Sequence, residues 1–495
     1  MRFTVLSHAG LLVESDQGKK LICDPWIIGS CYWRSWWNYP PVRRELIDGL
    51  KPDAIYLTHI HWDHFHSPSL ARFDKDTPII VPKGNYSRCK DDLTGLGFTN
   101  VTELRHGEPF ALDADFRLTS YQFGIFLDSA ALVECNGVKL LNLNDSKHMG
   151  PTLGQIVKRH QPIDFVFRSH SSANSRLSYE IVDDPTEEVD DMDRYIQDFA
   201  RTAQASGARY AIPFASNHCH LHRDSWPFNE VIQDPSMVRE YFERHGIDQP
   251  TAQVMVSGDT WDSQAGFAIE PTDCFTNKTQ RLLEYRQGQQ AKLDAFYDQE
   301  DRARVNLRVV EKYFRGLARK LPWLLKWRLR NTWYTYVLYC EQKPKYIFRI
   351  NVSKGRVEEL PLDTDLSDNQ AHPLQIHTSA FIFLRSIGYR IFSHMSIGKR
   401  VFYKVTKAAK GKMEELNLIF NLEEYDMLPL WRNLKPRSLQ TWCLRWREIL
   451  LYLLLVRDKL LHRRLDFGKY LRPAPAPGPF ACDKTAQLAA PSAQR

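Results

Sequence analysis

The chain has 495 residues, of which 43% are hydrophobic, and a formal net charge of +7. This length predicts about two to four domains with sizeable cores. The basic excess is modest and no nucleic-acid-binding module is recognised, so we expect no nucleic-acid partner. The nine cysteines show no paired spacing and no secretion signal is evident, which predicts free thiols and a cytoplasmic location.

Residues 1–290 alternate strand-like and helix-like patterns, which is typical of an α/β fold. A first strand is expected at 3–10, followed by a hairpin at 12–26. The apolar run from Pro52 to Leu57 predicts a buried strand that ends where a polar cluster begins. A second hairpin is expected at 129–145, with its turn at Asn136-Gly137.

The polar cluster His59-x-His61-x-Asp63-His64 is the most informative feature of the chain. Imidazole and carboxylate are ligands that transition metals prefer, and four of them on one loop can hold two ions. On an extended stretch His59 and His61 point to one side, whereas Asp63 and His64 turn toward a second position. Imidazoles packed this closely would repel one another on protonation if no ion lay between them. We therefore expect a metal site rather than a histidine-rich surface turn.

This loop, together with the first strand and the two hairpins, resembles the metallo-β-lactamase superfamily. The resemblance implies an αβ/βα sandwich with a metal-binding edge. It also implies that Asp145, which closes the second hairpin, bridges two ions, since a carboxylate can bind both at once. The implied metal ligands are His59, His61, Asp63, His64 and Asp145, and Asp63 and Asp145 are the expected catalytic carboxylates.

Within this superfamily the chain resembles the CMP-N-acetylneuraminate hydroxylase family. The likeness is carried by Asp24-Pro25-Trp26, by Trp36-Trp37 with Pro40-Pro41, by the metal loop, and by Pro213-Phe214-Ala215. It extends over residues 1–425 and is strong to residue 225. It implies an oxygenase that hydroxylates an anionic sugar-nucleotide-like metabolite.

Two departures from that family limit what the resemblance implies. A Rieske module needs Cys-x-His and Cys-x-x-His pairs, and no Cys-x-His occurs in this sequence. We therefore expect no iron–sulfur cluster in this chain and a separate Rieske protein or ferredoxin as electron donor. The third histidine of many superfamily members is also missing around residues 120–124, so the first metal position either lacks one ligand or uses Asp128.

A further ligand is expected in the loop after the strand predicted at 210–214. Three histidines, His218, His220 and His222, lie there within five residues. The family position falls nearest His222, and His218 and His220 stay open as alternatives. His8 and His170 each follow a strand-like run, and strand ends converge on the metal pocket in this fold, so both are candidates for contacting the metal ligands or the substrate.

The pattern changes after residue 290. Residues 291–430 combine a strongly basic stretch with strands predicted at 333–340 and 346–352, which indicates a smaller accessory α+β domain.

The C-terminal part divides into a basic amphipathic helical segment at 431–471 and a tail at 472–495. The apolar run Ile449–Val456 is too short to span a bilayer, which takes about twenty residues. Three alternatives remain for this segment: peripheral contact with an anionic membrane through 438–472, docking on a partner, or packing on its own domain. The proline-rich tail has too little apolar content to fold, so disorder is expected.

Two chemical classes remain open for the metal site, with one or two transition-metal ions as cofactors. In the oxidative class, iron activates dioxygen and a C–H bond is hydroxylated. In the hydrolytic class, zinc or manganese activates a water that attacks an ester, lactone or phosphodiester, and Asp63 or Asp145 orients it. The hydroxylase likeness and the missing third histidine favour the oxidative class. A lipid- or partner-binding protein with a vestigial metal site is the remote alternative.

Overall fold

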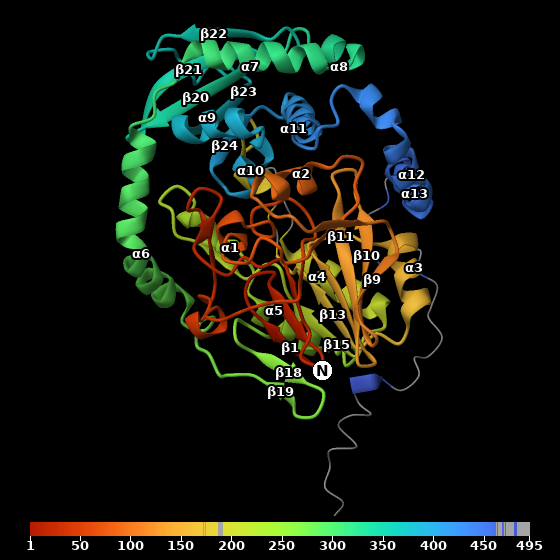
Figure 1. Ribbon diagram of the computed structural model, residues 1–495. Helices are drawn as coiled ribbons and strands as arrows, with labels where there is room; N and C mark the ends of the chain where they lie inside the picture. Colours follow the sequence, from red (N-terminus) through yellow and green to blue (C-terminus); the bar gives the residue numbers. More distant parts are fainter. Residues whose placement is uncertain are drawn as a thin grey trace, which may run out of the picture.

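The computed structural model describes residues 1–171, 173, 175–186, 192–461, 463, 468–469, 471 and 480–482. Two packed sheets form the N-terminal part, and a third sheet lies in the C-terminal part (Figure 1). Helix α6 (Lys278–Asp301) runs along one side of the molecule and joins the two parts.

The first sheet of the N-terminal part has eight strands in the order β19-β18-β1-β2-β3-β6-β7-β8. The predicted opening hairpin is confirmed, since β2 and β3 pair antiparallel and Gly18 takes a φ of +78° in the turn between them. The strands are β1 (Arg2–Val5), β2 (Leu11–Glu14), β3 (Lys20–Cys23), β6 (Ala54–Tyr56), β7 (Ile79–Pro82), β8 (Val101–Leu104), β18 (Thr260–Asp262) and β19 (Gly266–Ala268).

The second sheet has seven strands in the order β17-β15-β13-β12-β11-β10-β9. The second predicted hairpin is confirmed: β11 and β12 are joined by Asn136 and Gly137, whose φ angles of +47° and +82° suit a type I′ turn. The strands are β9 (Glu108–Asp113), β10 (Phe116–Phe123), β11 (Asp128–Cys135), β12 (Val138–Asn144), β13 (Phe165–Arg168), β15 (Tyr210–Pro213) and β17 (Thr251–Ala252).

The two sheets pack face to face around an aromatic core. Phe3 of β1 contacts Phe165 and Phe167 of β13 edge-on, with ring centroids 5.0 and 5.4 Å apart. Helices α1 (Ser67–Leu70) and α2 (Arg88–Gly95) cover the outer face of the first sheet, and α3 (Gly150–His160), α4 (Asp193–Ser206) and α5 (Pro235–Arg244) cover the second. This is the predicted αβ/βα sandwich.

A small three-stranded sheet lies beside the sandwich and carries the late histidine loop. Strand β16 (His218–His220) pairs with β5 (Trp36–Asn38), which pairs with β4 (Ser30–Cys31). The register places His218 opposite Asn38 and His220 opposite Trp36. Short 3-10 helices occur at η1 (Arg44–Leu46), η2 (Ser175–Ser178), η3 (Trp226–Glu230) and η4 (Leu430–Leu434).

The C-terminal part is the expected smaller α+β domain, with a six-stranded sheet in the order β14-β24-β23-β20-β21-β22. Its strands are β14 (Tyr179–Ile181), β20 (Tyr334–Cys340), β21 (Lys343–Asn351), β22 (Arg356–Leu360), β23 (Leu374–Ser379) and β24 (Val401–Val405). Its helices are α7 (Leu307–Lys320), α8 (Trp323–Arg328), α9 (Ala380–Tyr389), α10 (Phe392–Ile397) and α11 (Lys410–Glu424).

The predicted division between residues 290 and 291 needs correction. It falls inside helix α6, which continues unbroken to Asp301. In addition, β14 comes from the N-terminal part yet pairs in parallel with β24 of the accessory sheet. The chain therefore enters the C-terminal sheet once before it returns to complete the sandwich.

The C-terminal segment forms two helices, α12 (Pro436–Leu444) and α13 (Trp446–Leu460), that lie against the sandwich (Figure 1). Residues 480–482 also pack on it, with Phe480 and Cys482 buried in the core between the sheets. The prediction of a disordered tail is therefore wrong for residues 480–482. The remaining tail residues, 472–479 and 483–495, lie outside the described residues. Of the helices described, none is long and apolar enough to cross a bilayer.

Candidate metal centre

Strand ends from both sheets deliver the predicted metal-binding residues to one edge of the sandwich. His8 follows β1, the loop of residues 59–64 follows β6, and Asp145 follows β12 directly. Each strand is buried at its C-terminal end, so the candidate ligands follow where the chain leaves the core. Asp145 therefore lies beside the histidine loop although 81 residues of sequence separate it from His64.

Six of these side chains form two groups that could each hold a metal ion. The first group is His8, Asp63 and His64, and the second is His59, His61 and Asp145. Within each group the candidate ligand atoms all lie within 4.8 Å of one another.

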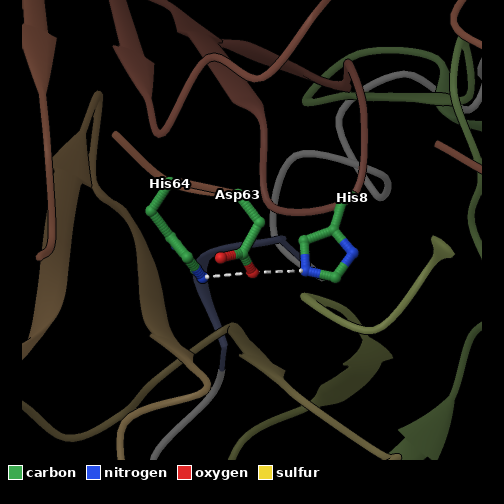
Figure 2. A group of neighbouring side chains, drawn as sticks. All are labelled: His8, Asp63 and His64. Carbon is green, nitrogen blue, oxygen red and sulfur yellow. Dashed lines mark ion pairs between the residues drawn. The ribbon is translucent and has the colours of Figure 1, made fainter. Parts of the chain in front are cut away.

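Figure 2 shows the first group, in which the Asp63 carboxylate lies between two imidazoles. Its Oδ2 is 3.1 Å from Nε2 of His8 and 3.3 Å from Nε2 of His64. All three side chains are buried. The ring of His8 was expected only as a candidate contact, and its position makes it a member of the ligand group itself.

Asp145 lies between the two groups. Its Oδ2 is 3.6 Å from Nε2 of His59, and its Oδ1 is 3.7 Å from Nε2 of His64. One carboxylate oxygen thus faces each group, which is the placement that a bridging ligand needs.

The orientation of His64 is set by Asp24, a residue to which the sequence had given no role. Nδ1 of His64 lies 2.8 Å from Oδ2 of Asp24, and Thr58 donates to the same carboxylate through its backbone N–H and its hydroxyl. A carboxylate that holds one ring nitrogen of a metal-binding histidine directs the other nitrogen to the metal. Asp24 therefore turns Nε2 of His64 into the site.

Tyr32 gives Asp63 a comparable support. Its buried hydroxyl donates a hydrogen bond to Oδ1 of Asp63, which leaves Oδ2 facing the two imidazoles. Nothing in the local sequence indicates this role, because Tyr32 precedes Asp63 by 31 residues. The contact depends on a left-handed turn over residues 32–34, where three consecutive φ angles are positive.

The residues present fit a bound metal. Nε2 of His8, Nε2 of His64 and Oδ1 of Asp145 are buried and make no well-aligned hydrogen bond with the described residues. Burying polar atoms without partners is costly, and a cation at this point would satisfy all three. The donor set of nitrogen and oxygen atoms suits iron, zinc or manganese.

The electrostatics of two of the candidate ligands, His61 and Asp63, suit metal binding. Burial, assisted by the neighbouring His59, lowers the pKa of His61 to about 3, so its imidazole is neutral and can donate a lone pair. Burial alone would raise the pKa of Asp63, but His64 and His8 hold it well below its ordinary value. The carboxylate is therefore ionised, as a metal ligand must be.

Asp128, the predicted substitute for a missing histidine, lies in the same cavity but in neither group. Burial raises its pKa to about 6, and the nearby Asp145 adds to this increase whereas His59 opposes it. Asp128 is thus placed next to the metal ligands without completing either set.

The three late histidines have different surroundings, and the prediction that placed the ligand nearest His222 needs correction. Nε2 of His222 lies 3.0 Å from Glu300 and its Nδ1 lies 3.7 Å from Asp224, so carboxylates occupy both sides of its ring. Nδ1 of His220 lies 3.0 Å from the hydroxyl of Ser35. Neither histidine belongs to the two ligand groups.

His218 is the late histidine that faces the metal centre. It lines the same cavity as His61, Asp63 and Asp145, and its ring centroid is 5.3 Å from that of His8. Its imidazole stacks on Trp36 at 3.6 Å, and its buried Nδ1 has no hydrogen-bond partner among the described residues.

His170 lies behind the cavity wall rather than in it. It is fully buried between Ser169 and Ser171, which line the cavity, and its backbone N–H donates to Ser216. Burial lowers the pKa of its ring to about 3. Of these three residues, the two serines line the cavity and His170 does not.

The metal groups open into a cavity of about 370 Å³ that both parts of the molecule enclose. The sandwich supplies the metal-binding side, with Phe126 and Lys147 beside it. Helix α10 supplies Ser393 and Ser396, and helix α11 supplies Asn417 and Asn421. The accessory domain thus contributes polar side chains to the cavity that holds the candidate metal ligands.

No family model matches the chain. A curated relative from Mycolicibacterium smegmatis, named as a Rieske 2Fe-2S iron-sulfur protein, is 26% identical over 316 residues, which are 57% of this chain and 59% of the relative. Cytidine monophosphate-N-acetylneuraminic acid hydroxylase of Mus musculus is 30% identical over 154 residues, 29% of this chain and 26% of that enzyme. The chain therefore spans only part of the length of the relatives it matches.

Among solved structures, isothiocyanate hydrolase from Delia radicum gut bacteria overlaps 54% of this chain and 100% of its own, with 17% identity and a TM-score of 0.39. A structural overlap with this TM-score gives no information about the function of this chain. The two sheets with outer helices and the histidine–aspartate loop at their edge are those of the metallo-β-lactamase fold. The chain has this fold, and over 154 residues its sequence is similar to cytidine monophosphate-N-acetylneuraminic acid hydroxylases.

Proposed function

We propose that the chain is an iron-dependent hydroxylase of a small anionic metabolite of the sugar-nucleotide kind. The observation that carries this proposal is the composition of the two ligand groups, each of which offers two imidazoles and one carboxylate. Sets of two histidines and one carboxylate with open positions are typical of non-haem Fe(II) oxygenases. The similarity to a hydroxylase at 30% identity supports the same chemistry.

Hydroxylation of a C–H bond by dioxygen consumes two electrons and two protons. One oxygen atom enters the substrate as a hydroxyl group and the other leaves as water. Iron bound at the two groups would supply the redox chemistry. The sequence has no Cys-x-His pair, so we propose that a separate iron–sulfur protein, a Rieske protein or a ferredoxin, delivers the electrons.

The chain's own residues would position the reactants. Asp145 holds both ligand groups together, and Tyr32 and Asp24 fix the orientation of Asp63 and His64. Phe126 and Tyr425 line the cavity and limit the access of water to it.

The cavity lining supports a polar, anionic substrate. Five serines and two asparagines line it, namely Ser169, Ser171, Ser216, Ser393, Ser396, Asn417 and Asn421. Hydroxyl and amide groups of this number suit the hydroxyl groups of a sugar. Lys147, two residues after Asp145 in sequence, adds a positive charge at the cavity wall.

A hydrolytic function is the second candidate, and the adjacency of the two groups favours it. Two metals held a few ångströms apart can activate a water and stabilise the leaving oxygen of an ester, a lactone or a phosphodiester. In that case Asp63 or Asp145 would orient the attacking water. A vestigial site is disfavoured because Oδ1 of Asp145 is left buried without a hydrogen-bond partner.

Metal analysis combined with oxygen uptake separates the candidates. We expect protein purified without chelators to contain one or two iron atoms per chain. With a reduced ferredoxin and a cytidine monophosphate sugar, it should consume one dioxygen per hydroxylated product. Protein treated with a chelator and reloaded with zinc is the matched control and should consume none. Stoichiometric zinc in the isolated protein, with hydrolysis of a phosphodiester or lactone in the absence of oxygen, would establish the hydrolase instead.

A further inference from the structure

The outer side of the C-terminal helices carries the densest group of exposed apolar side chains on the described molecule. We call it the helical face and define it by the exposed large apolar residues between 430 and 461. Their exposed fractions reach 65% at Trp431, 72% at Leu434 and 75% at Leu460. The members are Leu430, Trp431, Leu434, Leu439, Leu444, Trp446, Ile449, Leu450, Leu453, Val456, Leu460 and Leu461.

The inner side of the same helices explains why this face remains uncovered. Leu451 is fully buried against Phe123 and Met149 of the sandwich. Arg437 forms an ion pair with Glu103 and a hydrogen bond with the carbonyl of Gly84. The helices are therefore fixed to the sandwich by one side (Figure 1), and the side chains of the helical face are the ones that stay exposed. The segment thus packs on its own domain, and this packing leaves the apolar helical face exposed to a membrane or a partner.

The charges around the helical face have one sign. Residues 430–461 contain seven Lys or Arg and two acids, Glu448 and Asp458. Both acids are buried, and they pair with Arg445 and with Arg457 and Lys469 respectively. The exposed bases include Lys435 and Lys459, with Arg447 partly exposed. In the described part of this segment, no carboxylate reaches the surface.

We infer that the helical face docks on an anionic membrane surface. Contiguous exposed apolar patches of this kind mark interaction sites on otherwise soluble proteins. Tryptophan and leucine on one side with flanking lysine and arginine is the composition of helices that lie in the headgroup region of a bilayer. A 15-residue α13 is about 22 Å long, so it lies along the surface instead of crossing it. The bases would contact the phosphates of anionic lipids.

The excess of exposed basic residues also favours docking of the helical face on a bilayer over docking on a second copy of the chain. Two helical faces brought together would place bases against bases, and neither copy offers an exposed acid in this segment to compensate. A lipid surface supplies both components that the face lacks, acyl chains for the leucines and negative headgroups for the lysines.

Co-sedimentation of the full chain with vesicles tests the inference. We expect the chain to pellet with phosphatidylcholine vesicles that contain 30% phosphatidylserine, and binding to fall at least tenfold on pure phosphatidylcholine. The triple variant Trp446→Ser, Leu453→Ser, Leu460→Ser should lose binding at least tenfold on the anionic vesicles. All three side chains are more than half exposed, so the variant should keep its thermal unfolding temperature.

The matched control is Leu283→Ser on α6, a leucine 49% exposed on another part of the molecule, which should bind vesicles like the unmodified chain. Equal pelleting of the triple variant and the unmodified chain would overturn the inference. So would absence of pelleting in the unmodified chain, or lipid-independent self-association, measured by sedimentation velocity, that the triple variant abolishes.

Discussion

Two buried clusters of histidine and carboxylate differ in whether the protein itself completes them. In one, the imidazole of His222 lies 3.0 Å from Glu300, and Arg400 pairs with both Glu300 and Asp224 at 2.8 and 3.1 Å. At the metal centre, by contrast, Oδ1 of Asp145 has no hydrogen-bond partner among the described residues. Histidine and carboxylate side chains are thus fully paired within the protein in one cluster and left with an unpaired oxygen in the other.

The two clusters differ in the source of the cation that pairs with their carboxylates. Arg400 lies directly before β24 of the accessory domain, and Glu300 lies near the end of α6. Together with His222 they tie the histidine loop to the second domain with charges from this chain alone. Neither ligand group of the metal centre contains an arginine, so a bound cation would supply there the charge that Arg400 supplies in the other cluster. An incomplete cluster indicates a ligand site, and a completed one indicates a structural link.

The largest effect is expected when the incomplete cluster loses its bridging carboxylate. Asp145→Ala removes the oxygens that face both groups. We expect the metal affinity to fall more than the roughly 10–100-fold that is typical of losing an outer partner, with activity lost in proportion. Elemental analysis after dialysis against a weak chelator measures this effect. Glu359→Ala, at an exposed position of β22, is the control and should retain its metal. Full metal retention in Asp145→Ala would contradict the bridging role.

Disrupting the cluster of His222, Glu300 and Arg400 should lower the free energy of unfolding and leave the metal content unchanged. Arg400→Met leaves Glu300 buried without its arginine, and breaking a buried pair costs about 3–5 kcal/mol of unfolding free energy. Urea unfolding measures this change, and the metal content should stay at the level of the unmodified chain.

The double variant Arg400→Met, Glu300→Leu sharpens that comparison. It removes both partners and should recover part of the lost stability, because no buried charge is then left uncompensated. Loss of metal in Arg400→Met without loss of stability would mean that the cluster belongs to the metal centre.

The same comparison explains how far the sequence could predict the site. The metal loop lies within six residues, and Asp145 closes a hairpin whose turn, Asn136-Gly137, is evident from composition. Patterns within a few residues of sequence determine the local backbone geometry directly. The structure places Asp145 beside the metal loop, as predicted. The two sheets could be predicted for the same reason, since their strands alternate with helices and end at turns.

What the sequence did not predict depends on contacts between distant segments. The resemblance favours His222 as a ligand because the family position falls nearest to it, but Glu300, whose carboxylate lies 3.0 Å from its ring, is 78 residues further on. Asp24 and Tyr32 were not assigned roles, since each supports the site across more than 30 residues of chain. The predicted division at 290 falls inside α6 because the change of sequence pattern at that point does not coincide with the end of the helix.

The smallest of the expected effects concerns an outer partner of the incomplete cluster. Asp24→Asn keeps the size of the side chain but removes the negative charge that holds Nδ1 of His64 at 2.8 Å. Loss of such a partner typically weakens metal binding about 10–100-fold, which competition with a coloured chelator can measure. Asp224→Asn is the matched control, because Asp224 stands in the corresponding place beside His222 in the completed cluster. It should leave the metal affinity unchanged. Equal metal affinities for the two variants would mean that carboxylates beside histidines act alike in both clusters, and the distinction between them would then fail.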